Sequence, residues 1–200
     1  MLIVLEGIDG SGKATQAKML NPDFLLAFPR YDKFIGKVIQ LLLQFSWGQR
    51  INPYLFACLF AADRWLAKPK INYWLKQGKT VVIDRYTGSS QAHQGAKYKA
   101  EKQPKIINWI DWLENKIFKL PRPDKVFFLN LAPDKTKQLM AKRGREKDAA
   151  EKDFYHQKKA YEIYQLLAKR NKWIIINSLD KQEKVLTAKE IHEKIISRLN

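Results

Sequence analysis

The chain has 200 residues, 46% of them hydrophobic, which suits one folded domain and excludes a disordered chain. A single cysteine, Cys58, excludes an intramolecular disulfide framework, and with three scattered histidines it makes no recognisable zinc spacing. Lysine and arginine number 37 against 20 acidic residues, and the net charge of +17 permits a polyanionic partner such as nucleic acid. Because the lysines are spread along the chain, we favour a lysine-rich solvated surface over nucleic-acid binding.

The sequence shows no segment that would direct the chain to a membrane. No apolar run approaches the roughly 20 residues needed to cross a bilayer. The start, Met1–Glu6, is too short and too acidic at its end for a signal peptide. We therefore expect a cytoplasmic protein with no membrane contact.

Apolar, β-rich runs alternate with longer stretches of helical periodicity. The runs predicted as strands are 2–5, 24–28, 80–83, 126–131 and 173–176. The stretches predicted as helices are 35–45, 53–77, 105–119, 133–143 and 154–169. Apolar runs without alternation are typical of strands buried on both faces of a parallel sheet, and their alternation with helices indicates βαβ units. The pattern predicts one α/β domain over residues 1–200, with a parallel five-stranded sheet flanked by helices.

A glycine-rich segment follows the first predicted strand. Gly7-Ile-Asp-Gly-Ser-Gly-Lys13 has the G-x-x-x-x-G-K spacing of a phosphate-binding loop (P-loop), and a helix is expected to begin near Gly12. Glycines let backbone amides turn toward an anion, the helix N-terminus adds positive potential, and Lys13 adds a full charge. The residues expected to bind the nucleotide phosphates are Gly7, Ile8, Asp9, Gly10, Ser11, Gly12, Lys13, Ala14 and Thr15. The loop alone leaves ATPases, GTPases and kinases open, and the lack of an N-K-x-D pattern weighs against a GTPase.

Ala14 departs from the P-loop pattern, which has a serine or threonine there as a magnesium ligand. Thr15 cannot replace it, because the next residue of a helix points about 100° away. Magnesium readily keeps several waters, so nucleotide oxygens, water and carboxylates can still hold it. The candidate carboxylates are Asp9 in the loop and Asp84 at the end of the third predicted strand.

A charged stretch without an apolar stripe, 142–152, lies between two predicted helices. A solvated connection and a lid over an anionic ligand both fit it. The lid interpretation depends on the phosphate site, and we place the candidate lid at 142–153.

Five motifs occur in order along the chain. They are Glu6-Gly-Ile-Asp-Gly10, Phe28-Pro-Arg-Tyr31, Leu59-Phe-Ala-Ala-Asp-Arg64, Asp84-Arg-Tyr86 with Ser89-Ser-Gln-Ala-His-Gln-Gly95, and Leu120-Pro-Arg-Pro-Asp124. Together they resemble the thymidylate kinase family from Leu2 to about Leu167, and the fourth motif is the most specific. The resemblance implies a P-loop kinase fold, a homodimer, and phosphorylation of dTMP to dTDP by ATP with Mg²⁺, a step in dTTP synthesis.

The resemblance also assigns roles by position. Phe60 matches the ring that stacks on thymine, Arg64 the arginine that bonds a base carbonyl, and Ser90 a residue at the base edge. Arg85 matches the clamp on the acceptor phosphate, and Asp9 the acid near the sugar 3′-hydroxyl. The other expected substrate-binding residues are Phe28, Arg30, Tyr31, Gln91 and His93. A plainer alternative makes Phe60 and Tyr31 core aromatics and pairs Arg64 with an acid on the helix surface.

Phosphoryl transfer needs positive charge around the migrating group. Some thymidylate kinases supply an arginine from the loop position that Gly10 occupies here, so the resemblance implies the type with a lid arginine. Arg143 or Arg145 would then act beside Asp9, Lys13 and Arg85. We favour Arg145, because Arg143 falls at the end of a predicted helix.

Two departures from the family pattern leave alternatives open. His93 stands where the family usually has a tyrosine that crowds the ribose 2′ position, which suggests a sister kinase for dUMP, UMP or another deoxynucleotide. Ala14 and the charge of +17 suggest a catalytically inactive protein that binds nucleic acid. In addition, the short spacing between Lys13 and Phe28 predicts that the first helix ends near the Asn21-Pro22 pair.

Overall fold

Five parallel strands form the centre of the molecule. The computed structural model describes residues 1–44, 51–142 and 154–199. The strands are β1 Leu2–Glu6, β2 Phe24–Ala27, β3 Val81–Asp84, β4 Lys125–Asn130 and β5 Ile174–Asn177. They lie in the order β2-β3-β1-β4-β5, and each neighbouring pair is parallel. All five predicted strands and the α/β class are confirmed.

Helices connect the strands, and each of the five stretches predicted as a helix forms one, although Gln77, Phe118 and Lys119 lie beyond the observed helix ends. The α-helices are α1 Lys13–Met19, α2 Phe34–Gln44, α3 Pro53–Lys76, α4 Thr87–Gly95, α5 Gln103–Trp112, α6 Pro133–Lys142, α8 Phe154–Arg170 and α9 Ala188–Ile196. A 3₁₀ helix, η2 (Ala100–Lys102), precedes α5, and a π-helix, η3 (Leu113–Ile117), continues it. As predicted, α1 ends just before the Asn21-Pro22 pair.

The helices α4 and α9 were not predicted from the sequence. In α4 every residue except Thr87 and His93 is buried, so the helix has no polar outer face and shows no amphipathic period. The sequence did contain a signal for the start of α9, because Thr187 and Glu190 have the spacing of a capping box, which they form in the structure. Burial of Ile191 and Ile195 then holds α9 against the sheet.

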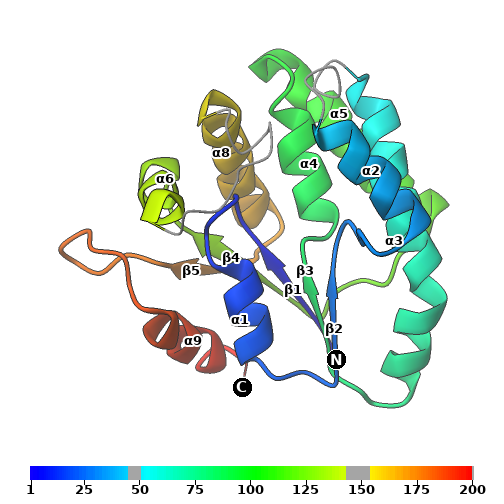
Figure 1. Cartoon of the computed structure of the whole chain (residues 1–200). Helices are drawn as coiled ribbons and strands as arrows, with labels where there is room; N and C mark the ends of the chain where they lie inside the picture. Colours follow the sequence, from blue (N-terminus) through cyan, green and yellow to red (C-terminus); the bar gives the residue numbers. More distant parts are fainter. Residues whose placement is uncertain (45–50, 143–153, 200) are drawn as a thin grey trace.

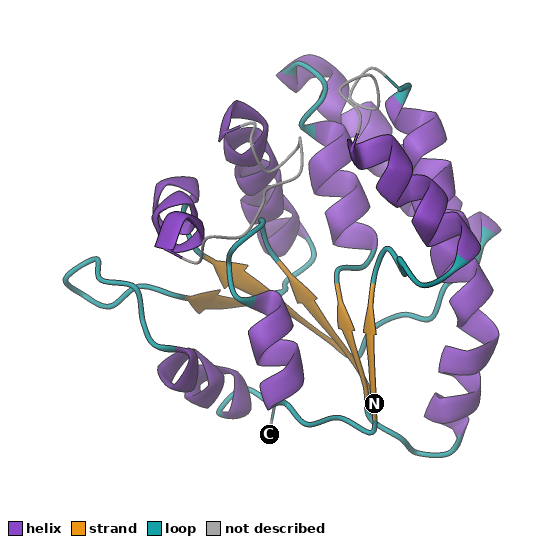
Figure 2. Cartoon of the chain, viewed as in Figure 1, coloured by secondary structure: helices purple, strands orange, loops and turns teal. Residues whose placement is uncertain are grey.

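The fold has three layers, shown in Figures 1 and 2. On one face of the sheet, α1 and α9 pack on side chains such as Ile3 and Leu5 of β1. On the other face, α3 packs on Leu2 and Val4, while α4, α5 and α8 enclose Phe128. The arrowheads of β1, β2 and β3 point toward the same end of the molecule in Figure 2. The loops that follow these strands therefore meet at one edge of the sheet, where open α/β sheets bind their ligands.

The two edge strands depart from the prediction of burial on both faces. Leu25 of β2 and Ile175 of β5 are 40% and 47% exposed, whereas every residue of β1 is buried. Phe24 and Leu26 pack toward α3, and Ile174 and Ile176 pack toward α9. Each edge strand is thus covered by helices on one face only.

Two sequence predictions fall outside the described residues. The candidate lid lies there apart from Lys142, and so do Arg143 and Arg145. Within the described ranges, no helix is both long enough and apolar enough to span a membrane.

Candidate active site

The loop between β1 and α1 curls around the ammonium group of Lys13. Gly7, Gly10 and Gly12 adopt φ values of 147°, 77° and 95°, which favour glycine, and Gly12 is the N-cap of α1. A Cβ on Gly7 would lie 2.8 Å from Oγ of Ser11. Nζ of Lys13 donates to the Ile8 carbonyl at 2.7 Å, and the side chain is only 4% exposed. A glycine-rich loop with a buried lysine at the start of a helix is the arrangement that holds nucleotide phosphates.

The charge on Lys13 depends on its acidic neighbours. Burial lowers the pKa of Lys13 to about 8, and Arg85 acts in the same direction, while Asp84, Asp9 and Glu6 oppose them. The amine therefore stays protonated at pH 7.

Inside the same loop, Oγ of Ser11 is buried and has no hydrogen-bond partner among the described residues.

Asp9 and Arg85 join the P-loop to the turn after β3. Arg85 takes a left-handed conformation (φ 69°), and its Nη2 forms an ion pair with Oδ1 of Asp9. Gln157 of α8 donates to the second oxygen, Oδ2, at 2.8 Å. Burial opposes the charge on Asp9, but the cations Arg85 and Lys13 and the Gln157 hydrogen bond outweigh it and hold the pKa of Asp9 below its usual value. The carboxylate is therefore ionised at neutral pH.

Asp84 is the stronger candidate for a magnesium ligand. It ends β3, and its Oδ1 is buried with no hydrogen-bond partner in the part of the chain that the structure describes. No three histidine, cysteine or acidic side chains among the described residues gather as a metal cluster. An oxygen donor set of one or two carboxylates fits a magnesium ion that keeps waters and nucleotide oxygens as its other ligands. The residues present are therefore compatible with Mg²⁺ despite Ala14.

A pocket opens beside the Asp9–Arg85 pair. Its lining consists of Asp9, Phe28, Pro29, Tyr31, Leu43, Phe56, Phe60, Arg64, Arg85, Ser89, Ser90, His93, Gln94, Lys97 and His156. Every residue that the sequence analysis assigned to the substrate lines it, except Arg30 and Gln91. A lining that combines aromatic rings, two arginines and small polar groups suits a flat base that carries a phosphate. We refer to this cavity as the acceptor pocket.

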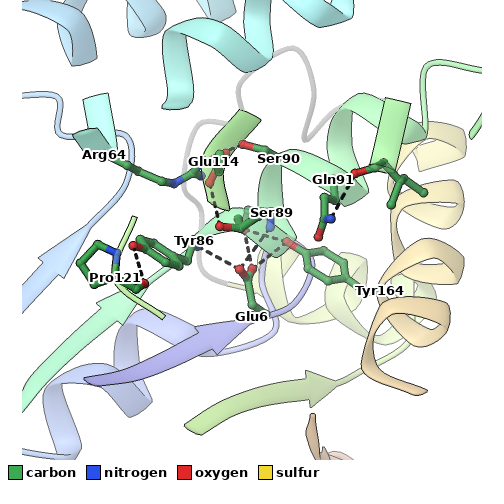
Figure 3. Close-up of polar contacts among 11 residues, drawn as sticks. Glu6, Arg64, Tyr86, Ser89, Ser90, Gln91, Glu114, Pro121 and Tyr164 are labelled. Atoms are coloured by element: carbon green, nitrogen blue, oxygen red, sulfur yellow. Dashed lines mark hydrogen bonds and ion pairs between the residues drawn. The ribbon is translucent and has the colours of Figure 1, made fainter. Parts of the chain in front are cut away.

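Arg64 is held rigidly in the wall of the acceptor pocket. Its side chain is 1% exposed, and Nη1 donates to Oγ of Ser90 and to Oε1 of Glu114, each at 2.7 Å (Figure 3). Its guanidinium carbon lies 5.8 Å from the Phe28 ring centroid and 5.9 Å from that of Phe60. Nε is buried and bonds no group within the described ranges. The acid that pairs with Arg64 is thus a buried carboxylate, not one on the helix surface.

Arg30 and Gln91 support the pocket from outside it. Arg30 pairs with the buried Asp63, donating from its backbone N at 2.8 Å and from Nε at 3.0 Å. The amide of Gln91 donates to the Ile107 carbonyl at 3.2 Å, which turns it toward α5. Both side chains fix the segments that carry Phe28 and Ser90.

A second buried carboxylate, Glu6, ties the sheet to α4 (Figure 3). Its Oε1 accepts from the backbone N of Tyr86 at 2.9 Å, and its Oε2 accepts from the hydroxyl of Ser89 at 2.6 Å. The Tyr164 hydroxyl adds a bond at 3.3 Å. Burial raises the pKa of Glu6, and these donors oppose the rise. Glu6 thereby holds the start of α4, the helix that carries Ser90 and His93.

Several residues of the site were not predicted from the sequence. Among them are Glu6, Gln94, Lys97, Glu114, His156 and Gln157. Only Glu6 carried a local signal, because a charged residue ends an otherwise apolar strand. The others lie on helices whose place beside the pocket is decided by packing.

The fold places a lysine-bearing P-loop beside a pocket that is suited to a phosphorylated base, and Asp9 belongs to both. This arrangement indicates the class of P-loop nucleoside monophosphate kinases. The sequence model of the family Thymidylate kinase matches residues 5–190. A thymidylate kinase of Arabidopsis thaliana is 32% identical over 206 residues, covering 99% of this chain and 72% of that protein. A probable thymidylate kinase of Methanocaldococcus jannaschii is 35% identical, covering 100% of this chain and 95% of that protein. The chain belongs to the thymidylate kinase family.

A solved structure agrees with this assignment. The thymidylate kinase of Candida albicans superposes with a TM-score of 0.80 at 25% identity, covering 99% of this chain and 90% of that one. The P-loop kinase fold predicted from the sequence is therefore confirmed.

Proposed function

We propose that this protein transfers the γ-phosphoryl group of ATP, with Mg²⁺, to dTMP and so forms dTDP. The observation that carries the proposal is the position of Asp9, which belongs to the P-loop and also lines the acceptor pocket. A donor phosphate held by the loop would therefore meet an acceptor phosphate held by Arg85. Membership of the family supports dTMP as the acceptor, and the relatives give no support to a sister kinase or an inactive homologue.

In this proposal the acceptor base enters between the aromatic side chains of the pocket. Phe60 supplies a face for stacking, and Arg64 supplies the donor that bonds a base carbonyl, with Ser90 at the base edge. Because Glu114 and Ser90 already hold Nη1 of Arg64, the orientation of its guanidinium group is fixed before the base binds. Preorganised donors of this kind add specificity at low entropic cost.

The phosphoryl transfer needs positioning and positive charge more than a general base. The attacking oxygen belongs to a phosphate monoester, which is largely ionised at neutral pH. Lys13 would bind the β- and γ-phosphates, and Arg85, held by Asp9, would bind the acceptor phosphate. When bound, Mg²⁺ supplies positive charge to the transferring phosphoryl group, and Asp84 and Asp9 are the side chains that would hold it.

A further cation is expected over the transferring group. Gly10 has no side chain to supply it, so we assign this role to a lid arginine, Arg145 or Arg143. Both lie outside the described residues.

The family resemblance suggests a homodimer, and an exposed apolar stripe supports it. On α3, Leu55, Leu66 and Tyr73 are 57%, 52% and 60% exposed, and 100° per residue places them on one side of the helix. The neighbouring α2 exposes Leu41. We propose that this face packs on a second copy of the chain.

The activity is tested with purified protein, Mg-ATP and a panel of acceptors: dTMP, dUMP, UMP, dCMP and dGMP. We expect dTMP to give the highest kcat/KM. Equal turnover of dTMP and UMP would reject the acceptor assignment, and no turnover of any acceptor at high magnesium would reject the kinase itself.

A further inference from the structure

A chain of hydrogen bonds runs from Arg85 through two histidines in the wall of the acceptor pocket. Nη1 of Arg85 lies 3.2 Å from Nε2 of His93, and Nδ1 of His93 lies 3.3 Å from Nε2 of His156. The two imidazole rings are stacked, with centroids 5.5 Å apart and planes at 23°. All three residues line the pocket.

The chemistry of arginine decides which atoms carry the protons. A guanidinium group has five N–H donors and no acceptor, so Nε2 of His93 must accept and carries no hydrogen. A neutral imidazole with a bare Nε2 carries its hydrogen on Nδ1, which therefore donates to His156. Nε2 of His156 must then accept, and its own hydrogen is on Nδ1. Both histidines are neutral and share one tautomer.

The surroundings of His93 favour the neutral form. Its half-buried ring faces Asp9 and Lys13 of the P-loop, Arg85 after β3, and His156 and Tyr164 of α8. Burial lowers the pKa of His93 well below its usual value, and Arg85, His156 and Lys13 act in the same direction against Asp9. The Tyr164 ring meets it edge-on at 6.0 Å.

We infer that His93 is a positioning residue for Arg85, which it holds toward the acceptor phosphate as a neutral hydrogen-bond acceptor backed by His156. Arg85 is then anchored on both terminal nitrogens, by Asp9 on Nη2 and by His93 on Nη1. Two anchors fix the rotation of the planar guanidinium and leave Nε and one hydrogen on each terminal nitrogen for a ligand. The functional part of this inference rests on the proposed role of Arg85.

The tautomers can be measured without any activity. The chain has only three histidines, so a long-range ¹H–¹⁵N correlation spectrum of ¹⁵N-histidine-labelled protein shows three ring systems. Assignment uses the variants His93→Gln, His156→Gln and His192→Gln. At pH 7 we expect His93 and His156 to be neutral with the hydrogen on Nδ1. A cationic His93, or one with its hydrogen on Nε2, overturns the inference.

The positioning role is measured by kinetics. His93→Phe keeps a ring and removes the acceptor, and we expect the KM for dTMP to rise about tenfold, as loss of one hydrogen bond to a charged group predicts. His93→Gln places an amide oxygen near Nε2 and should restore the KM to within about threefold of wild type. The KM for ATP should change less than twofold in both variants.

The control and the outcomes separate this inference from the proposed function. His192→Gln, on α9 at the opposite face of the sheet, should behave as wild type. If the wild-type enzyme phosphorylates dTMP and His93→Phe leaves its KM unchanged, the positioning role is wrong. Equal losses in His93→Phe and His93→Gln would show that ring shape matters and not the acceptor. A wild-type enzyme with no activity on dTMP would reject the proposed function instead, and the spectrum would still decide the tautomers.

Discussion

At the scale of single residues, the pKa of Lys13 sets a pH dependence. The pKa is lowered to about 8, so the charged form is present below pH 8 and is lost above it. A bound polyphosphate favours the charged amine and raises this pKa. We therefore expect kcat/KM for ATP to fall above about pH 8, while kcat holds to a higher pH.

The measurement is a pair of rate profiles between pH 6 and 10 with saturating dTMP. Lys13→Arg is the matched variant, because guanidinium stays charged throughout this range. The Lys13→Arg enzyme should have a lower rate at every pH, and its kcat/KM for ATP should not fall at alkaline pH. An unchanged alkaline fall in Lys13→Arg would assign it to another group.

Glu114 lies against Arg64 with neither side chain open to water, and its other oxygen accepts from Thr87 at 2.7 Å. Glu114→Gln leaves a buried guanidinium without its counter-charge, which should lower the free energy of unfolding by about 2 kcal/mol. The same substitution should raise the KM for dTMP, because the orientation of the Arg64 guanidinium group is no longer fixed. Urea unfolding and steady-state kinetics test both effects.

Asp111→Asn is the control for Glu114, since Asp111 is an exposed acid that bonds only Asn115 among the contacts described. It should change stability by less than about 0.5 kcal/mol. Equal effects of the two substitutions would mean that burial of the carboxylate is not what matters.

Ala14 gives a prediction about magnesium. Ala14→Thr restores the hydroxyl that P-loops use as a ligand, at the first turn of α1. We expect a modest fall in the magnesium concentration for half-maximal rate, because carboxylates, water and nucleotide oxygens already suffice. If the natural protein is inactive and Ala14→Thr is active, the natural chain is not a working kinase.

At the scale of elements, α4 approaches the sheet too closely for a side chain at its second residue. A Cβ on Gly88 would lie 2.5 Å from the Trp173 ring and 2.9 Å from Oε1 of Glu6. Gly88→Ala must therefore push α4 away from β1, at a cost of about 1–3 kcal/mol. Thermal unfolding should show the loss, and the KM for dTMP should rise because α4 carries Ser90 and His93.

Gly95→Ala is the matched control at the other end of α4. Its Cβ would meet the end of the Ile163 side chain at 2.9 Å, and that group can rotate away. It should be the milder of the two substitutions. If both substitutions lower the stability equally, the loss comes from replacing glycine within the helix and not from the contact of α4 with Glu6.

At the scale of the whole molecule, the exposed stripe of α3 predicts self-association. Leu66→Glu puts a charge at the middle of that face and should convert a dimer of about twice the 23.5 kDa chain mass into a monomer. Light scattering after size exclusion measures the mass. Tyr155→Glu, at a residue of α8 that is 67% exposed, should leave the mass unchanged. A monomeric wild-type protein would contradict the prediction.

The sequence by itself determined the strands, most helices and the phosphate loop of this protein. These features are local, because a strand is predicted from a short apolar run and the loop from three glycines and Lys13 within seven residues. The aromatic and basic residues expected to bind the acceptor followed from motifs that are also local, and all of them except Arg30 line the cavity.

Only the tertiary structure decided what those residues touch. Arg64 meets Glu114 fifty residues away, and Glu6 meets Tyr164 across most of the chain. His93 meets His156 because α4 and α8 pack side by side. Whether a strand lies at the edge or the centre likewise depends on its neighbours in space, so the exposure of Leu25 and Ile175 could not be predicted. Long-range pairing is set by packing of whole elements, and a short window of sequence does not contain it.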